Sequence, residues 1–336
     1  MNAIVGPNGS GKTTIIEALY TLLRGSSFKG SISEIAQYGG NQFRAQLEIK
    51  TENTLHQRAL GYQEIEAAVQ KKWSIDGKNY ARLPVAARLP VVLFEPDLAR
   101  LISGGPERRR QYLDQIASQL DLEVAIAQNR FERALKQRNQ LLQRLRAAPH
   151  KAPPEELFIW NTQLARLSEQ IIEARHRVIE KLQNEVSEYY EQLGGTDSIF
   201  LTYQSSVSSD PTSYASRLLQ FLETSVQRDI ALGHTTFGPH RDDLEIRLAD
   251  QLAVQRASRG EIRTVVIALK LLETELLSKH FEKTDIRPTL LLDDVLSELD
   301  LVHQERVLAG FKNHQVFITT TDAHALTAGV HTIALG

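Results

Sequence analysis

The sequence predicts an α/β domain whose two halves are separated by an inserted helical arm. Three observations predict it. Residues 6–13 read GPNGSGKT between a short apolar strand and an apolar-periodic helix, residues 289–294 read TLLLDD, and apolar side chains recur every three or four positions through residues 164–193. The first pattern is a phosphate-binding loop, the second a buried strand that ends in two carboxylates, and the third the seam of a coiled coil.

The glycine-rich loop has the residue types and spacing that a triphosphate requires. Glycines lack Cβ atoms, so consecutive backbone N–H groups can turn inward around the β- and γ-phosphates. Lys12 adds a positive charge, and the Thr13 hydroxyl can ligate a bridging Mg²⁺ ion. An ordinary glycine-rich turn that caps a helix is the alternative, but the complete eight-residue match between strand and helix favours the phosphate loop. We expect nucleotide contacts from Gly6, Pro7, Asn8, Gly9, Ser10, Gly11, Lys12, Thr13 and Thr14.

The composition is that of an ordinary soluble protein. The chain has 336 residues, 42% of them hydrophobic, and a formal net charge of −2, so any nucleic-acid binding must come from local basic patches. No apolar run approaches the roughly 20 residues of a membrane span, and the start MNAIVGPNG resembles neither a signal peptide nor a transit peptide. We therefore expect a cytoplasmic protein without a membrane partner. The absence of cysteine rules out disulfides and thiolate metal sites.

Changes in periodicity divide the chain into three expected parts. Residues 1–115 form the first lobe of the head, residues 116–195 the inserted arm, and residues 196–336 the second lobe. In the first lobe, residues 44–50 alternate between apolar and polar types as in a half-buried strand, and Asp76-Gly77 marks a hairpin turn.

The arm is expected to be an antiparallel helical (coiled-coil) hairpin. Its second helix carries a seam with alternating intervals of three and four, at Leu164, Leu167, Ile171, Ala174, Val178, Leu182, Val186, Tyr189 and Leu193. Its first helix carries a partner stripe at Phe131, Leu135, Leu142 and Leu145. The segment PHKAPP at 149–154 must break the helix between them.

The second lobe contains the motifs that indicate to which class of nucleoside triphosphatase this protein belongs. Ser258-Arg259-Gly260-Glu261 opens a long amphipathic helix, which precedes the aspartate pair and then SELD at 297–300. This order resembles that of an ABC-type ATPase head, in which the serine and the helix N-terminus contact the γ-phosphate of ATP held by another subunit. We therefore expect Ser258, Arg259 and Gly260 to act in trans in a homodimer. Ser258 could instead be only an N-cap, because serine is a favoured capping residue.

The two aspartates have different expected roles. Asp293 ends an apolar strand, where it can bind Mg²⁺ together with Thr13. Asp294 follows at the position where ABC heads usually carry a glutamate that polarises the attacking water, so Asp294 and Lys12 are the expected catalytic residues. The shorter aspartate predicts slow hydrolysis. An acidic pair held by structure alone is disfavoured, because adjacent carboxylates without a cation repel each other.

Basic residues gather in the first arm helix although the protein is net acidic. Such a face can neutralise DNA phosphates without reading sequence. The alternative is a solvated flank of the coiled coil, paired with acids of the second arm helix. A further cluster, at residues 108–110, lies at a helix start, where positive charge favours a nearby phosphate or acidic partner. The expected DNA contacts of the arm are Arg130, Arg133, Lys136, Arg138, Arg144 and Arg146.

Longer blocks of sequence resemble the RecF family, bacterial recombination-mediator ATPases related to SMC-type heads. The matching blocks, which span nearly the whole chain, are GPNGSGKTTIIEALY (6–20), FEPDLARLISGGPERRRQYLD (94–114), FGPHRDDLEI (237–246), the Ser258 helix start, and LLLDDVLSELD (290–300). The resemblance implies an ATPase head that dimerises on ATP and binds DNA at boundaries between single strands and duplex. It further implies action with RecO and RecR to load RecA at gaps during repair, replication restart and the SOS response.

The sequence departs from the family pattern in three places. The family has a few dozen residues before the phosphate loop, including part of the adenine pocket, so we expect a reading frame that begins upstream or a shortened chain. Glu261 stands where the family often has glutamine, which changes local electrostatics more than the fold. ABC heads also place a histidine after the last core strand. Here Thr320 or Thr321 could take its hydrogen bond, and His324 comes three residues late.

Other nucleotide-binding classes fit the sequence less well. A transporter's nucleotide-binding subunit would not carry a helical arm of this length between its motifs, and a chromosome-organising SMC protein would have a much longer arm. A nucleotide switch, in which ATP drives dimerisation and hydrolysis only resets it, stays open. Comparing turnover with and without DNA separates these classes.

Overall fold

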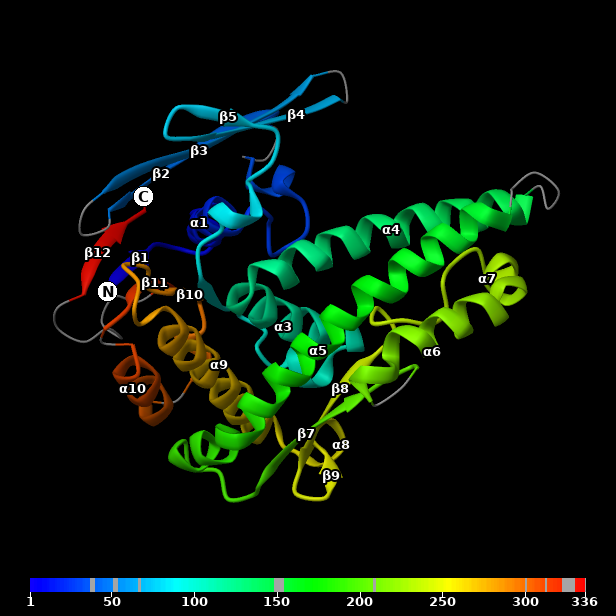
Figure 1. Ribbon diagram of the computed structural model, residues 1–336. Helices are drawn as coiled ribbons and strands as arrows, with labels where there is room; N and C mark the ends of the chain where they lie inside the picture. The colour runs from blue at the N-terminus through cyan, green and yellow to red at the C-terminus, as the bar shows by residue number, and fades with distance from the viewer. Residues whose placement is uncertain are drawn as a thin grey trace. The chain divides into compact units, whose positions relative to one another are not determined.

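The computed structural model describes residues 1–36, 40–50, 54–65, 68–147, 154–207, 210–299, 301–311, 313–321 and 330–335. They form two compact units, one of residues 1–98 with 270–336 and the other of residues 99–269. Helix α9 (Arg259–Phe281) contributes residues to both. Parallel and antiparallel sheets occur together with long helices, which confirms the α/β class (Figure 1). The division at residues 115 and 195 stays a prediction.

A five-stranded parallel sheet forms the centre of the first unit. Its order is β12 (His331–Ala334), β1 (Asn2–Val5), β11 (Gln315–Thr320), β10 (Thr289–Asp293) and β6 (Val91–Phe94). The first four of these strands are labelled in Figure 1. The apolar runs of the inner strand β10 and the edge strand β6 are both buried, as expected for strands of a parallel sheet. Val5 lies opposite Thr320, and Asp293 lies opposite Thr319. The carboxyl ends of β1, β10 and β11 therefore meet at one edge.

An antiparallel sheet forms the second layer of this unit. It contains β2 (Gln42–Lys50), β3 (Leu55–Ile65), β4 (Ala68–Ile75) and β5 (Lys78–Tyr80) in sequence order. Leu60, Tyr62 and Trp73 on one face are buried with Leu22 of helix α1 (Lys12–Arg24). Asp76 and Gly77 both have positive φ, as a tight hairpin turn requires. The predicted strand at 44–50 and the predicted turn are confirmed.

Short elements complete the first unit. They are the 3₁₀ turns η1 (Ile32–Ile35), η2 (Val85–Ala87) and η3 (Leu296–Glu298), and helix α10 (Leu301–Ala309). Buried Arg58 donates one hydrogen bond to the Leu22 carbonyl, at 2.7 Å, and another to the Ala87 carbonyl, at 2.6 Å. A guanidinium at the C-terminal end of α1 donates to a carbonyl of the last turn, and its positive charge is attracted to the negative end of the helix dipole. The C-terminal end of the helix that follows the phosphate loop is therefore held in place.

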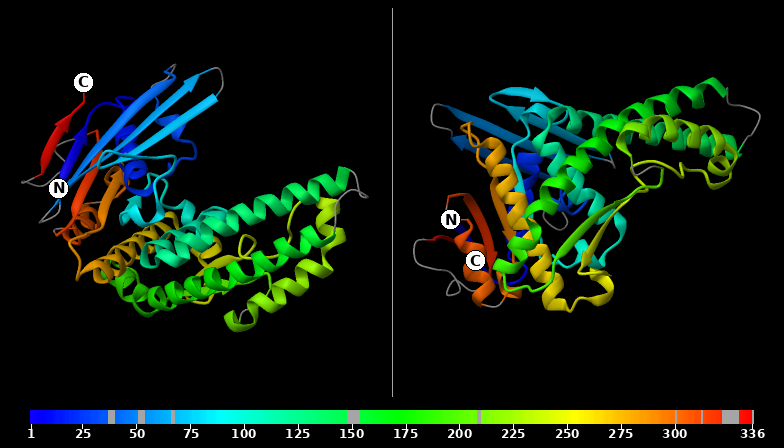
Figure 2. Two further views of the ribbon diagram at one scale, coloured as in Figure 1. Left: turned by 45° about the horizontal axis from the view of Figure 1, so that its top comes forward. Right: turned by 60° about the horizontal axis from the view of Figure 1, so that its bottom comes forward.

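The second unit is built around two long helices. Its elements are α2 (Arg100–Ser103), α3 (Pro106–Leu120), α4 (Leu122–Ala147), α5 (Pro154–Gln192), β7 (Ile199–Gln204), α6 (Pro211–Thr224), α7 (Val226–Leu232), β8 (Asp243–Leu248), β9 (Gln251–Leu252) and α8 (Ala253–Arg256). The predicted helices of the arm are confirmed as α4 and α5, which pack side by side (Figure 2). The predicted break at 149–154 lies outside the described residues except for Pro154, the first residue of α5. No described helix is long and apolar enough to cross a membrane.

Helix α5 buries more than the predicted coiled-coil seam. Every seam residue from Leu164 to Val186 is buried, but so are neighbours such as Ile172 and Ile179. The wider stripe follows from the contacts, because α5 packs against α6 and β7 as well as α4. Gln183 and Ser187 of α5 also hydrogen-bond backbone groups of β7, which covers an edge that would otherwise be free to pair.

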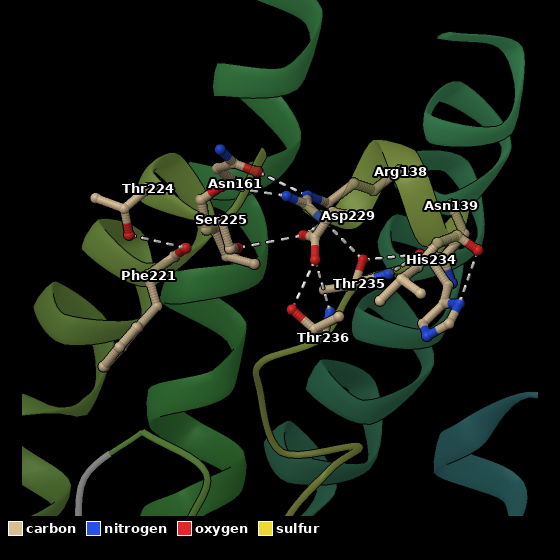
Figure 3. A network of polar contacts seen from close by, with 12 residues as sticks. Arg138, Asn139, Asn161, Phe221, Thr224, Ser225, Asp229, His234, Thr235 and Thr236 are labelled. Atoms are coloured by element: carbon tan, nitrogen blue, oxygen red, sulfur yellow. Dashed lines mark hydrogen bonds and ion pairs between the residues drawn. The ribbon is translucent and has the colours of Figure 1, made fainter. Parts of the chain in front are cut away.

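A buried ion pair joins four of these helices (Figure 3). Arg138 of α4 and Asp229 of α7 have no exposed side-chain surface, and their Nη1 and Oδ2 atoms lie 2.7 Å apart. Arg138 also donates to the Asn161 Oδ1 of α5 at 2.7 Å and to the Leu222 carbonyl of α6 at 3.3 Å. The Thr235 hydroxyl accepts another bond from Nη1, at 2.8 Å. A buried charge is tolerated when it is paired and hydrogen-bonded in this way.

Replacing Arg138 with Met should lower the free energy of unfolding by about 3–5 kcal/mol, because it keeps an apolar stem but leaves Asp229 buried without its cation. Urea denaturation measures the change. Exposed Arg133, on the same helix, provides the matched control, since Arg133→Met should change stability by less than about 0.5 kcal/mol. Equal stability of the two variants would contradict the structural role of the ion pair.

Candidate nucleotide-binding site

The predicted phosphate loop connects β1 to α1 in the first unit. Gly9 and Gly11 adopt φ values of 85° and 92°, a left-handed conformation that glycine adopts without strain. Gly11 is also the N-cap of α1. Pro7, Asn8 and Gly9 are exposed at the mouth of the loop. The loop thus has the conformation and the helix N-terminus that anion-binding loops use.

Lys12 is held against the loop that it follows. Its side chain is buried, and Nζ donates hydrogen bonds to the Gly6 carbonyl at 2.7 Å and the Pro7 carbonyl at 2.8 Å. Neutral carbonyls are weaker partners for an ammonium group than phosphate oxygens. The charge therefore lies at the loop and can exchange these bonds for bonds to an anion.

The structure brings Thr13 and Asp293 together across 280 residues of sequence. The Thr13 hydroxyl donates a hydrogen bond to Asp293 Oδ1, at 2.9 Å. Asp293 ends β10 and is almost completely buried. The two residues predicted to hold a metal ion are thus neighbours, and both offer the hard oxygen ligands that Mg²⁺ prefers.

Thr319 connects the two aspartates, a role that the sequence analysis did not assign. Its buried hydroxyl donates to Asp293 Oδ1 at 2.8 Å and accepts from the Asp294 N–H at 2.8 Å. Thr320 and Thr321 are the residues that the sequence suggested for a hydrogen bond at this place. Thr320 is buried and Thr321 exposed, while His324 lies outside the described residues. The signal that identifies Thr319 is its register opposite Asp293, which sequence alone does not provide.

Asp294 has two unusual features. Its φ is 52°, a left-handed conformation that costs a residue with a side chain roughly 1 kcal/mol or more. Its Oδ1 is buried, and no described residue donates a hydrogen bond to it. An unpaired buried carboxylate oxygen needs a partner such as water or a cation. Beside Thr13 and Asp293, this oxygen supports the fit of the site to Mg²⁺ and its water ligands.

Ser258, Arg259 and Gly260 lie in the second unit, at the exposed start of α9. The Ser258 hydroxyl accepts from the Glu261 N–H at 3.3 Å, and the Glu261 carboxylate accepts from the Ser258 N–H at 2.8 Å. This reciprocal pair is a capping box, and it explains why glutamate fits at position 261. The hydrogen bonds from Ser258 lower the pKa of Glu261 below its ordinary value. The N-cap interpretation is confirmed, and contact with a second subunit stays a prediction.

The predicted DNA contacts divide into two groups. Five lie exposed along α4, namely Arg130, Arg133, Lys136, Arg144 and Arg146. Arg138 is a correction, because its guanidinium is buried and paired with Asp229 and cannot reach a phosphate. The sequence already indicated that Arg138 is buried, because it follows Ala134 by four residues and precedes Leu141 by three, within the buried stripe of the helix.

The basic cluster at 108–110 has acidic and carbonyl partners within the second unit. Arg109 forms a two-point ion pair with Asp243, with N–O distances of 2.8 and 2.9 Å. Arg110 donates to the Asp242 carbonyl at 2.8 Å. The same two sequence blocks meet again where Arg175 pairs with Asp114 and donates to the Pro239 carbonyl. Of the two partners predicted for this cluster, a phosphate or an acid, Arg109 has an acid of the same chain.

The phosphate loop, the aspartates at the end of β10 and the two sheets define an ABC-type ATPase head with inserted helices. The family model described as RecF/RecN/SMC N terminal domain matches residues 1–335. The DNA replication and repair protein RecF of Thermomicrobium roseum is 32% identical over 97% of this chain and 89% of its own length. That of Ruminiclostridium cellulolyticum is 34% identical over 96% and 86%. The chain belongs to the RecF family.

Solved structures agree with this assignment. The structure of the recombination mediator protein RecF-ATPrS in the RecFOR pathway is similar with a TM-score of 0.85 at 28% identity, covering 100% of this chain and 90% of that one. The Smc head bound to the C-winged helix domain of ScpA has a TM-score of 0.53 at 14% identity, covering 99% and 85%. The second similarity concerns the fold alone.

Thr319→Val should expose the role of the hydroxyl between the aspartates. The Asp294 N–H loses its acceptor, a neutral bond that contributes about 0.5–1.5 kcal/mol, and the Asp293 carboxylate loses a donor, a bond to a charged group that contributes about 1.5–3 kcal/mol. We expect faster amide hydrogen exchange at Asp294 in Thr319→Val and near-normal exchange in Thr319→Ser, which keeps the hydroxyl. Exchange that is equally slow in both variants would show that Thr319 does not hold this turn.

Proposed function

We propose that this protein is an ATP-dependent DNA-binding recombination mediator with weak ATPase activity. The observation that carries the proposal is the hydrogen-bonded chain from Thr13 through Asp293 and Thr319 to Asp294, directly beside the phosphate loop. Membership of the RecF family, whose curated members are named DNA replication and repair proteins, supports the process.

The nucleotide would bind at residues 6–14. Backbone N–H groups of the loop and the N-terminus of α1 face the phosphates, and Lys12 supplies a mobile charge. Thr13 and Asp293 would hold Mg²⁺, which supplies charge neutralisation at the β- and γ-phosphates when bound. Asp294 accepts a hydrogen bond from the attacking water. Because aspartate is shorter than the usual glutamate, its carboxylate lies farther from that water, and turnover is slow.

The composite part of the site would come from a second copy of the chain. Ser258, Arg259 and Gly260 are exposed at the N-terminus of a 23-residue helix. A helix N-terminus favours an anion, here the γ-phosphate held by the other subunit. Two-fold symmetry then gives two equivalent sites, and ATP drives dimerisation.

DNA would be held without reading its sequence. The five exposed cations of α4 provide a sequence-independent phosphate surface. We propose that the protein binds single-stranded DNA and single/double-strand junctions in the cytoplasm. There it would act with RecO and RecR to load RecA in gap repair, replication restart and the SOS response. The solved relative's description as a recombination mediator in the RecFOR pathway supports this assignment.

A nucleotide switch is the second candidate function. The short side chain and strained backbone of Asp294 favour it, because a poorly placed base slows hydrolysis more than it weakens ATP binding. In that case ATP would set the dimer state and hydrolysis would only reset it. DNA-stimulated turnover favours the mediator, whereas stimulation only by a membrane partner would favour a transporter subunit.

Ser258 offers a direct test of the composite site. Ser258→Arg should leave ATP binding by the monomer nearly normal but abolish ATP-dependent dimerisation, because the large cation fills the space that the partner's γ-phosphate must enter. Ser258→Asp is the matched variant, since aspartate caps a helix as well as serine but repels phosphate. Sedimentation with a non-hydrolysable ATP analogue measures the dimer. Normal dimerisation of both variants would reduce Ser258 to an N-cap.

The arm surface has a separate test. Changing Arg133, Lys136 and Arg144 to Glu should weaken DNA binding uniformly across sequences and flatten its salt dependence by about one unit of log–log slope per lost contact. Reversing the three exposed cations Arg166, Arg177 and Lys181 on α5 makes the same change in net charge and serves as the control. Fluorescence anisotropy between 50 and 300 mM salt measures both, and an unchanged slope would move the DNA surface to the head.

A further inference from the structure

The antiparallel sheet of the first unit has one face buried and one face open. Tyr62, Trp73 and their neighbours point toward α1, which lies on that side of the sheet in Figure 1. Side chains alternate between faces along a strand, so the residues between these point the opposite way. Register then assigns the open face. Its members are Gln42, Arg44, Gln46, Glu48 and Lys50 of β2, Leu55, Gln57, Ala59, Gly61, Gln63 and Ile65 of β3, Gln70, Lys72 and Ser74 of β4, and Asn79 of β5.

The charge on this open face is positive. Arg44, Gly61 and Lys72 lie side by side across three strands, so two exposed cations flank a glycine. Strands lie about 4.8 Å apart, which puts the two Cα atoms roughly 10 Å apart. Within the described part of the chain, neither cation has a carboxylate partner. The one described acid on the face is Glu48, which accepts a hydrogen bond from Gln57.

The rest of the face also suits a phosphate backbone. Glutamine amides surround the two cations and can donate hydrogen bonds to phosphate oxygens, and the central residues are small. The described face has no aromatic side chain on which an unpaired base could stack, and stacking is the main contact of single-strand binding surfaces. The bulky apolar side chains Leu55 and Ile65 are at its two ends. A flat, donor-rich and cationic face without stacking groups fits duplex better than single strands.

We propose that this open sheet face is a second DNA surface, one that binds the phosphate backbone of duplex DNA through Arg44 and Lys72. The inference rests on the proposed DNA binding and deepens it, because it assigns the duplex part of a junction to a particular face of the head. Lys50 extends the same positive row toward the end of β2.

The test compares two pairs of charge reversals on one sheet. Arg44→Glu with Lys72→Glu alters the open face, whereas Lys71→Glu with Lys78→Glu makes the same net change on the other face, where both lysines are exposed. Fluorescence anisotropy with Mg·ATP measures binding to a labelled 30-base-pair duplex and to a 30-nucleotide single strand. A slope of 0.9 per phosphate corresponds to about fivefold per contact at 0.15 M salt, and thus about thirtyfold for two contacts.

We expect the open-face pair to lose about thirtyfold in duplex affinity, with a salt slope shallower by about two, and to bind the single strand nearly normally. The control pair should bind both probes like the wild type. Equal duplex affinity of the two pairs overturns the inference while the proposed function stands. A wild-type protein that binds neither probe overturns both.

Discussion

Three hydrogen bonds at the carboxyl edge of the parallel sheet hold the candidate site together. They run from Thr13 to Asp293, from Thr319 to Asp293, and from the Asp294 N–H to Thr319. These bonds connect the phosphate loop after β1 with the aspartates at the end of β10 and with Thr319 near the end of β11. The bond from Thr319 to Asp293 is buried and the other two are partly buried, so removing Thr319 leaves the buried Asp293 carboxylate without one of its donors. The position of Asp294 depends on these hydrogen bonds, because its left-handed backbone conformation is unfavourable without them.

The second unit depends on a different physical device, buried arginines with complete sets of partners. Arg138 joins four helices, and Arg175 joins α5 to Asp114 and Pro239. The Asp114 carboxylate opposes the desolvation of the Arg175 guanidinium, whose pKa is raised. Asp242 similarly accepts from the hydroxyls of Tyr203 and Tyr214. Burial raises the pKa of both phenols, so both donate throughout the physiological range. These groups explain why two polar sequence blocks of the family lie inside the fold.

Sequence reasoning succeeded where one short pattern encodes the structure. The phosphate loop, the apolar strand before Asp293 and the two arm helices all have a period or a motif that is visible locally. The capping box of Ser258 is equally local, because Glu261 is three residues away, but the sequence prediction contained only the N-cap as an alternative and not Glu261 as its partner. Thr319 could not be identified, since its role follows from strand register across the sheet. Asp229 comes 91 residues after Arg138, on a helix that the sequence analysis did not assign to the arm. The packing of α6 on α5 could not be predicted either, because it also joins segments that lie far apart in the sequence.

Residues 6–14 and Asp293 are proposed to form one Mg·ATP site. Isothermal titration of ATP, with and without Mg²⁺, into the wild type, Lys12→Ala and Asp293→Asn tests it most directly. We expect Mg²⁺-enhanced binding by the wild type and no detectable binding by Lys12→Ala. Mg²⁺ should enhance binding far less in Asp293→Asn, and circular dichroism should show all three proteins equally folded. Tight Mg·ATP binding by Lys12→Ala, or full Mg²⁺ enhancement in Asp293→Asn, would contradict the proposed site.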